Sequence, residues 1–108
     1  MELPTDTPST TRRVLCIEDE HFISELYARA LHKGGYEVTV IADGQEALVE
    51  AKTDKYDIIL LDLMVPNLTG IEILRILRDP AREVRIRAKI IITTNLEQRD
   101  DVDRKSVV

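Results

Sequence analysis

The apolar residues of this chain form two kinds of pattern that alternate along it. Short runs in which nearly every residue is aliphatic or β-branched are typical of strands buried in a parallel sheet. Between these runs, apolar residues recur every three or four positions, as in helices with one buried face. The strand-like runs occupy residues 14–17, 36–41, 58–61 and 90–93, and the helical patterns occupy residues 23–31, 44–52 and 69–79.

Residues at the ends of the helical patterns support this reading. Thr69 followed by Glu72 matches a capping box, and Asp43 is followed in the same way by a Glu three residues later. Gly34-Gly35 closes the first helix, and the third must stop before Pro80. Strands that alternate with helices of this length predict an α/β fold with right-handed crossovers, a parallel sheet and helices on both faces.

The composition fits one small soluble domain. The chain has 108 residues, of which 44% are hydrophobic and 32% charged, enough to build a real core. Its net charge of -5 gives no electrostatic reason to bind nucleic acid or an anionic membrane directly. We therefore expect no nucleic-acid or membrane partner for this domain.

Cysteine use and the amino-terminal segment indicate the compartment. Cys16 is the only cysteine and lies inside an apolar run, so we expect it to be buried, with no disulfide within the chain. A reducing cytoplasm is the natural location. Residues 1–11 are rich in Thr, Pro and Ser and contain no apolar stretch, which predicts a disordered lead-in rather than a signal peptide or anchor.

Acidic residues follow two of the strand-like runs. Asp62 stands where the run at 58–61 breaks into a turn rich in Pro, Asn and Gly, and Glu18-Asp19-Glu20 follows the run at 14–17. Ligands gather at the carboxyl ends of strands in open parallel sheets. We therefore expect these acids to lie together at one edge of the sheet.

Clustered carboxylates predict a cation site. Such groups repel one another, and one is pushed toward protonation unless a cation lies between them. Mg2+ prefers hard oxygen ligands and keeps several waters, which suits a shallow acidic site. Beside such a cation, Asp62 could act as a nucleophile toward a phosphoryl group and form an aspartyl-phosphate.

The last strand-like run supplies a hydroxyl to the same edge. Thr93 and Thr94 follow three isoleucines, and alternation along a strand turns the two side chains in opposite directions. Thr94 lies nearer the rim where a phosphate oxygen would sit, and its hydrogen bond to that charged oxygen would contribute roughly 1.5–3 kcal/mol. We interpret Thr93 as an ordinary strand residue.

Taken together, these stretches resemble the receiver domain of bacterial two-component response regulators. The resemblance runs from about Arg13 to Val108 and implies a flavodoxin-like, doubly wound parallel sheet with strand order 2-1-3-4-5. Each motif is weak alone, but their order and spacing are specific. The matching stretches are residues 14–20, 35–38, 42–48, 57–70 and 90–95.

The resemblance assigns roles to particular residues. Asp62 becomes the phosphoacceptor and Thr94 the switch hydroxyl. Asp19 becomes a direct Mg2+ ligand, Glu18 an acid that acts through a metal-bound water, and the main-chain carbonyl of Met64 a further ligand. The implied function is a signalling domain, not an enzyme, that receives its phosphoryl group from a histidine kinase or phosphotransfer protein and alters its partner interactions.

The family pattern is incomplete at the end of the chain. A Lys expected about twenty-two residues beyond the switch Thr, the fifth strand with its aromatic residue and the last helix are all missing, so we expect a receiver domain over residues 12–108 that is carboxy-terminally incomplete. Asn95 replaces the small residue usual after the switch Thr. An apolar fourth strand left at the sheet edge predicts self-association through that strand and residues 95–108.

Other functions remain open at this point. The chain could keep the receiver fold as an interaction module without phosphotransfer. A Mg2+-dependent aspartyl phosphohydrolase is disfavoured, because such enzymes carry a second Asp two residues after the nucleophile, where this chain has Met64. Flavin binding is disfavoured by the acidic loop after the first strand, where a flavin phosphate needs hydroxyl and N–H donors.

Overall fold

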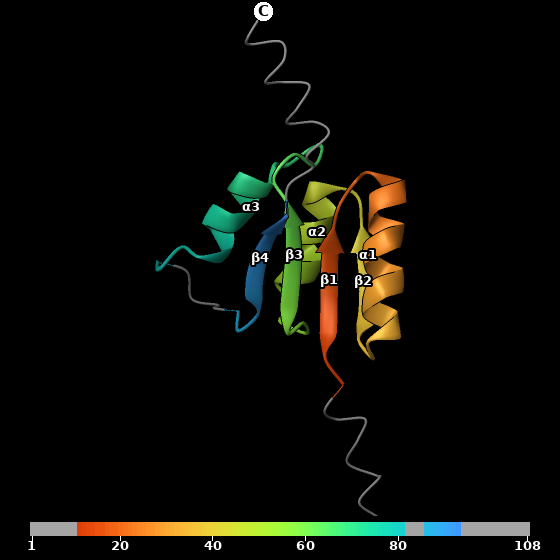
Figure 1. Ribbon diagram of the computed structural model, residues 1–108. Helices are drawn as coiled ribbons and strands as arrows, with labels where there is room; N and C mark the ends of the chain where they lie inside the picture. Colours follow the sequence, from red (N-terminus) through yellow and green to blue (C-terminus); the bar gives the residue numbers. More distant parts are fainter. Residues whose placement is uncertain (1–10, 82–85, 94–108) are drawn as a thin grey trace, which may run out of the picture.

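The computed structural model describes residues 11–81 and 86–93. In this part of the chain, strands and helices alternate, and the four strands form one parallel sheet in the order β2-β1-β3-β4 (Figure 1). The predicted α/β fold and every predicted element are confirmed. A fifth strand is not among the described residues. The elements are β1 (Arg13–Ile17), α1 (His21–Lys33), β2 (Glu37–Ile41), α2 (Gly44–Ala51), β3 (Ile58–Asp62), α3 (Gly70–Leu77) and β4 (Lys89–Thr93).

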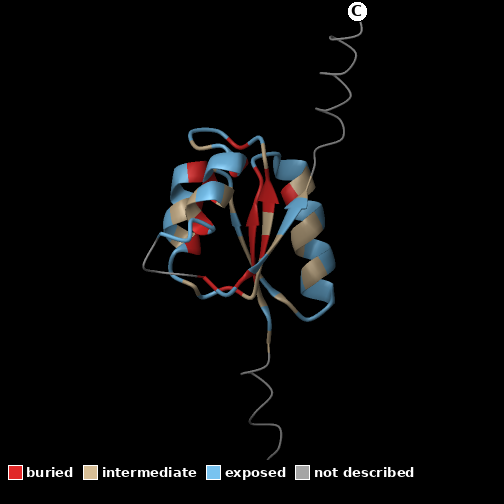
Figure 2. Ribbon diagram, turned by 90° about the vertical axis from the view of Figure 1, so that its left-hand side faces the viewer, coloured by how far each residue is buried: buried red, intermediate tan, exposed pale blue. Residues whose placement is uncertain are grey.

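Helices cover both faces of the sheet. Figure 2 shows α1 on one side and α2 with α3 on the other. The core lies on the α2 and α3 side, where alternate residues of the two central strands pack against residues from both helices. Burying each large aliphatic side chain there contributes roughly 1.5–3 kcal/mol. The central members of this core are Leu15, Ile17, Ala47, Ile59, Leu61 and Ile73.

The opposite face of the sheet is less completely covered. Val14 and Cys16 are buried there, as predicted for Cys16, but Ile91 is 43% exposed. The all-aliphatic run at residues 58–61 predicts a strand that is buried throughout, and this is wrong in part, because Ile58 and Leu60 are only half-buried. The physical reason is that α1 packs over β1 and β2, and within residues 11–81 and 86–93 no helix lies over β3 and β4 on this side.

The predicted helix caps are present. The Thr69 hydroxyl accepts from the Glu72 amide at 3.3 Å and the Glu72 carboxylate accepts from the Thr69 amide at 3.0 Å, which is the reciprocal capping box. Asp43 caps α2 by accepting from the Glu46 amide at 2.9 Å. Each cap stabilises its helix by about 1 kcal/mol. The two caps fix the starting points of α2 and α3 beside the carboxyl ends of the strands.

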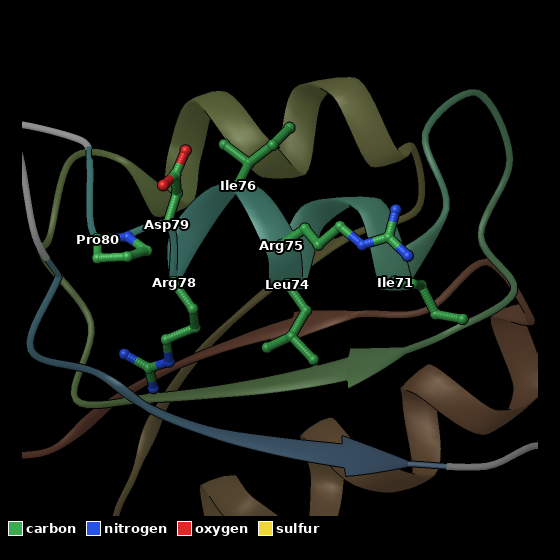
Figure 3. Close-up of a pocket in the computed structure, with 7 residues that line it drawn as sticks. All are labelled: Ile71, Leu74, Arg75, Ile76, Arg78, Asp79 and Pro80. Carbon is green, nitrogen blue, oxygen red and sulfur yellow. The ribbon is translucent and has the colours of Figure 1, made fainter.

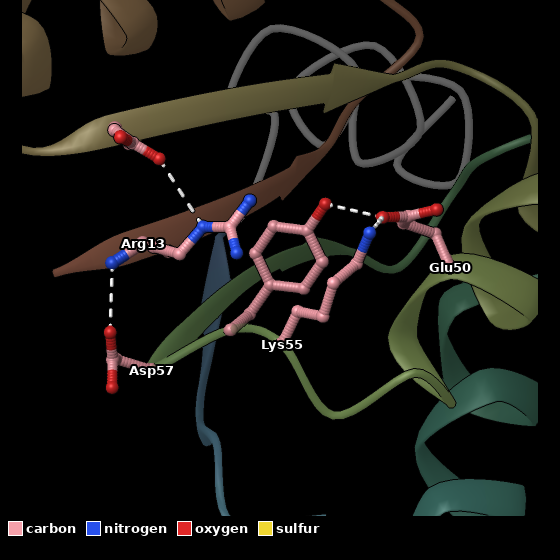
Figure 4. A network of polar contacts seen from close by, with 6 residues as sticks. Arg13, Glu50, Lys55 and Asp57 are labelled. Carbon is pink, nitrogen blue, oxygen red and sulfur yellow. Dashed lines mark hydrogen bonds and ion pairs between the residues drawn. The ribbon is translucent and has the colours of Figure 1, made fainter.

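A polar network ties the strands together at their amino-terminal ends (Figure 4). The Arg13 guanidinium lies 3.2 Å from Glu37 of β2, and the Arg13 amide donates to the Asp57 carboxylate at 2.8 Å. Nearby, the Tyr56 hydroxyl donates to Glu50 at 2.6 Å. Arg13 and Glu37 therefore form an ion pair, and Asp57 and Glu50 accept hydrogen bonds, at the end of the sheet opposite to Asp62.

None of the helices in the described ranges combines the length and the apolar character needed to span a bilayer.

Candidate functional site

The predicted acidic cluster is present at the carboxyl edge of the sheet. Asp62 is the last residue of β3, and Glu18 and Asp19 directly follow β1, its neighbour in the sheet. Because Ile17 pairs with Leu61, the residues after them emerge side by side. One carboxylate oxygen from each of the three acids lies within 4.8 Å of the others.

Burial makes this cluster electrostatically costly. Asp62 is 1% exposed and Glu18 is 3% exposed, whereas Asp19 faces solvent. Burial, followed by repulsion from Asp62 and Asp19, raises the pKa of Glu18 to about 7, although the hydrogen bond from the Glu20 amide opposes the shift. A carboxyl group whose pKa is near 7 and which has two acidic neighbours lies in a strongly negative potential. A bound cation would stabilise the ionised form of all three groups.

The two oxygens of Asp62 have different surroundings. Oδ1 accepts a hydrogen bond from the Met64 amide at 3.1 Å. Oδ2 is buried and has no hydrogen-bond partner among the described residues. Buried polar atoms in folded proteins nearly always have a partner, so an orphaned carboxylate oxygen points to a ligand.

These features fit a hard divalent cation. Mg2+ takes oxygen ligands, commonly one or two carboxylates, and retains waters on its open side. Here the buried oxygens of Glu18 and Asp62 and the solvent-facing carboxylate of Asp19 converge. The residues present are therefore suited to holding Mg2+ at the rim of the sheet.

The loop after Asp62 is held close to the end of β3. The Gly70 amide donates to the Leu63 carbonyl at 3.1 Å, and a Cβ at Gly70 would lie 2.4 Å from the Asp62 carbonyl oxygen. Only glycine therefore permits α3 to begin so near the nucleophile candidate. Met64 projects outward with 58% exposure, and Val65 turns back into the core.

The family of the chain follows from comparison with known proteins. The family model described as the response regulator receiver domain matches residues 14–106. The chain belongs to this family. The resemblance in the sequence is thereby confirmed, and with it the assignment of the fold.

Individual relatives agree with this assignment. The alkaline phosphatase synthesis transcriptional regulatory protein PhoP of Bacillus subtilis is 43% identical over 67 residues, which cover 62% of this chain and 28% of PhoP. The receiver domain of the Francisella response regulator 1452 has a TM-score of 0.70 and 32% identity, covering 86% of this chain and 74% of that one.

A second solved structure bears on the acidic site. It is the receiver domain of the sensor histidine kinase PA1611 from Pseudomonas aeruginosa PAO1, with a magnesium ion coordinated in its active site cleft. Its TM-score is 0.70 and its identity is 34%, over 86% of this chain and 75% of that one.

Not every predicted site residue of this receiver can be located. Thr93 ends β4 and pairs in register with Asp62, so the fourth strand does reach the acidic edge. Thr94, the predicted switch hydroxyl, and residues 95–108 lie outside the described residues, as do residues 1–10 of the lead-in predicted over residues 1–11. Their assignments stay predictions.

One contact near the site was missed at the level of sequence. The Asn67 side-chain amide donates to Asp43, although the two residues are separated by 24 positions. Asp43 was identified only as a helix cap, and Asn67 only as part of a turn. Nothing in either local pattern indicates that the two loops touch.

The receiver also has a hollow beside α3, with a volume of about 750 Å3 (Figure 3). None of the three clustered acids lines it. It follows the flank of one helix and brings no set of acidic or nucleophilic groups together, so we assign it no chemistry. Its lining residues are Ile71, Leu74, Arg75, Ile76, Arg78, Asp79 and Pro80.

Proposed function

We propose that this receiver accepts a phosphoryl group on Asp62 from a phosphohistidine, with Mg2+ bound beside it, and that phosphorylation alters the affinity of the domain for its partners. The observation that carries the proposal is the buried Asp62 carboxylate, which stands beside two other carboxylates and whose Oδ2 has no hydrogen-bond partner in the part of the chain that the structure describes. Membership of a signalling family supports the same function.

The residues divide the work between binding and bond formation. An Asp62 oxygen attacks the phosphorus, the new P–O bond forms as the P–N bond of the donor breaks, and the departing imidazole keeps the electron pair and takes up a proton. Asp19 would hold the cation directly, Glu18 through a water, and Met64 through its main-chain carbonyl. Bound Mg2+ neutralises charge on the phosphoryl oxygens.

The hydrogen-bonding of Asp62 suits this role. The Met64 amide holds Oδ1 at 3.1 Å and so fixes the plane of the carboxylate. The hydroxyl of Thr94 is proposed to bind a phosphoryl oxygen once the group is attached, which would draw the end of β4 toward the site. That movement is the proposed link between chemistry and partner binding.

The proposed partners follow from the donor. A histidine kinase or a histidine phosphotransfer protein would supply the phosphoryl group, which places the reaction in the cytoplasm. PhoP, of which the matched stretch covers 28%, is named as a transcriptional regulator. An output of that kind would require a further domain, because the net charge of -5 does not favour nucleic-acid binding by this one.

Intact mass spectrometry tests the proposal. After incubation with acetyl phosphate and Mg2+, the wild-type chain should gain one phosphoryl group, and Asp62→Asn should gain none. Asp79→Asn changes an exposed carboxylate near the far end of α3 and should label like the wild type. Labelling that persists in Asp62→Asn would refute the assignment.

The same experiment separates the alternatives. A folded wild-type chain that takes no label, with or without Mg2+, would favour an interaction module without phosphotransfer. Continuous release of inorganic phosphate over many turnovers would favour a phosphohydrolase. Stoichiometric labelling followed by slow decay supports a signalling domain.

A further inference from the structure

Two loops that are distant in the sequence are bound to each other beside the acidic site. Asp43 precedes α2, and Asn67 lies in the loop that joins β3 to α3. The carboxylate of Asp43 accepts from the Asn67 amide through Oδ1 and from the Glu46 backbone amide through Oδ2. One carboxylate therefore caps α2 and holds the loop that follows Asp62.

The backbone of the two loops is joined at the same place. The Gly44 amide donates to the Pro66 carbonyl at 3.0 Å. A Cβ at Gly44 would lie 1.9 Å from the Leu68 carbonyl oxygen, so the first turn of α2 rests directly against the loop. The contact between the loops is thus both a hydrogen-bonded and a steric one.

Asn67 itself adopts an unusual conformation that suits this contact. Its φ is +73°, in the left-handed region, which asparagine tolerates better than most residues. The Leu68 amide donates to the Pro66 carbonyl at 2.9 Å across this tight turn. The side-chain amide of Asn67 is thereby directed at Asp43 rather than at its own backbone.

The joined segment begins only two residues beyond Met64. Toward Asp62, the loop is held by the Met64 amide on Oδ1 at 3.1 Å, and toward α3 by the Gly70 amide on the Leu63 carbonyl at 3.1 Å. Val65 anchors the loop by packing in the core, and the link to α2 is a further, hydrogen-bonded attachment to an element other than β3 and α3. Without it, the backbone after Met64 could relax away from α2.

We propose that Asp43 and Asn67 are positioning residues, which clamp the loop after Asp62 to the start of α2 and so hold the main chain at Met64 ready for the cation before any ligand binds. This inference rests on the proposed function. Neither residue touches the reacting atoms. They act by removing the cost of ordering the loop when Mg2+ and the phosphoryl group arrive.

Asp43 is ionised at the pH values at which the domain would work. The hydrogen bonds from the Glu46 amide and the Asn67 side chain lower the pKa of Asp43, so the carboxylate is ionised throughout the neutral range. The ionised carboxylate therefore makes a charge-assisted hydrogen bond with Asn67 and caps the amino terminus of α2.

Substitutions can separate the two tasks of Asp43. Asn67→Gly preserves the freedom to adopt positive φ but removes the amide donor. Asp43→Ser keeps a side chain that can cap α2 but is too short to hold Asn67 as well. Tyr56→Phe is the matched control, because it removes one hydrogen bond to Glu50 near the other end of α2 without changing charge.

The decisive measurement is Mg2+ affinity by calorimetry on the unphosphorylated chain. Asn67→Gly and Asp43→Ser should each weaken binding about tenfold, the lower end of the range seen when groups that support a metal ligand are lost. The double variant should be no weaker than either single one, and Tyr56→Phe should bind like the wild type. Hydrogen exchange at the Gly44 amide without Mg2+ should accelerate in Asn67→Gly.

Wild-type affinity in Asn67→Gly, or strictly additive losses in the double variant, would overturn the clamp. Equal weakening by Tyr56→Phe would also overturn it, because the effect would then be one of general stability. These results are independent of labelling at Asp62. If the wild-type chain takes no phosphoryl label, the proposed function is rejected. If the wild type is labelled normally and Asn67→Gly binds Mg2+ as tightly as the wild type, only the clamp is rejected.

Discussion

At the scale of single residues, Glu18 makes stability depend on pH. Its pKa rises from 4.5 to about 7 on folding, so its stabilising contribution is complete below the unfolded value and is lost as pH rises through 7. Glu18→Gln should therefore stabilise the metal-free chain at about pH 8, by on the order of 1–3 kcal/mol, and much less at about pH 5. Urea denaturation in a chelator at both pH values measures the difference. Glu20→Gln removes an exposed charge two residues along the chain and should have little effect. An equal gain from Glu18→Gln at both pH values would contradict this explanation.

At the scale of elements, the close approach of α3 to β3 depends on Gly70. An alanine Cβ there would meet the Asp62 carbonyl oxygen at 2.4 Å and the Leu63 Cα at 2.6 Å, and backbone atoms cannot move aside cheaply. We expect Gly70→Ala to destabilise the chain by roughly 1–3 kcal/mol, although alanine is normally the better helix former. Urea denaturation should show this loss. Gly34→Ala is the matched control, since its nearest contacts at 3.5 and 3.6 Å are ordinary ones and its φ is -82°. A Gly70→Ala chain as stable as Gly34→Ala would mean that α3 is free to shift.

At the scale of the whole molecule, the outer strand presents apolar surface. Ile91 and Ile92 of β4 are 43% and 46% exposed on opposite faces, and in the part of the chain that the structure describes β4 pairs only with β3. Edges and patches of this kind favour pairing with another chain. We therefore expect the average mass in sedimentation to rise with concentration, and Ile92→Lys to suppress that rise. Val49→Lys changes an exposed residue on α2 and should leave it unaltered. A monomer at all concentrations would refute self-association through β4.

The sequence by itself determined the alternation of strands and helices, the caps at Asp43 and Thr69, the burial of Cys16 and the gathering of Glu18, Asp19 and Asp62. Each of these follows from local chemistry. Periodicity reports which side of an element is buried, cap residues bond to amides three positions away, and carboxyl ends of parallel strands share one edge.

Only the tertiary structure decided how far each face of the sheet is covered, that the Oδ2 of Asp62 has no hydrogen-bond partner within the described ranges, and that Asp43 meets Asn67. These features depend on the distance between elements that are remote in sequence. A run of isoleucines and leucines has the same sequence pattern whether helices cover one face of the strand or both. A capping aspartate uses one carboxylate oxygen for the cap, and no local pattern specifies the partner of the other oxygen. The two loops can approach this closely because Gly44 has no side chain, and a Cβ there would collide with Leu68.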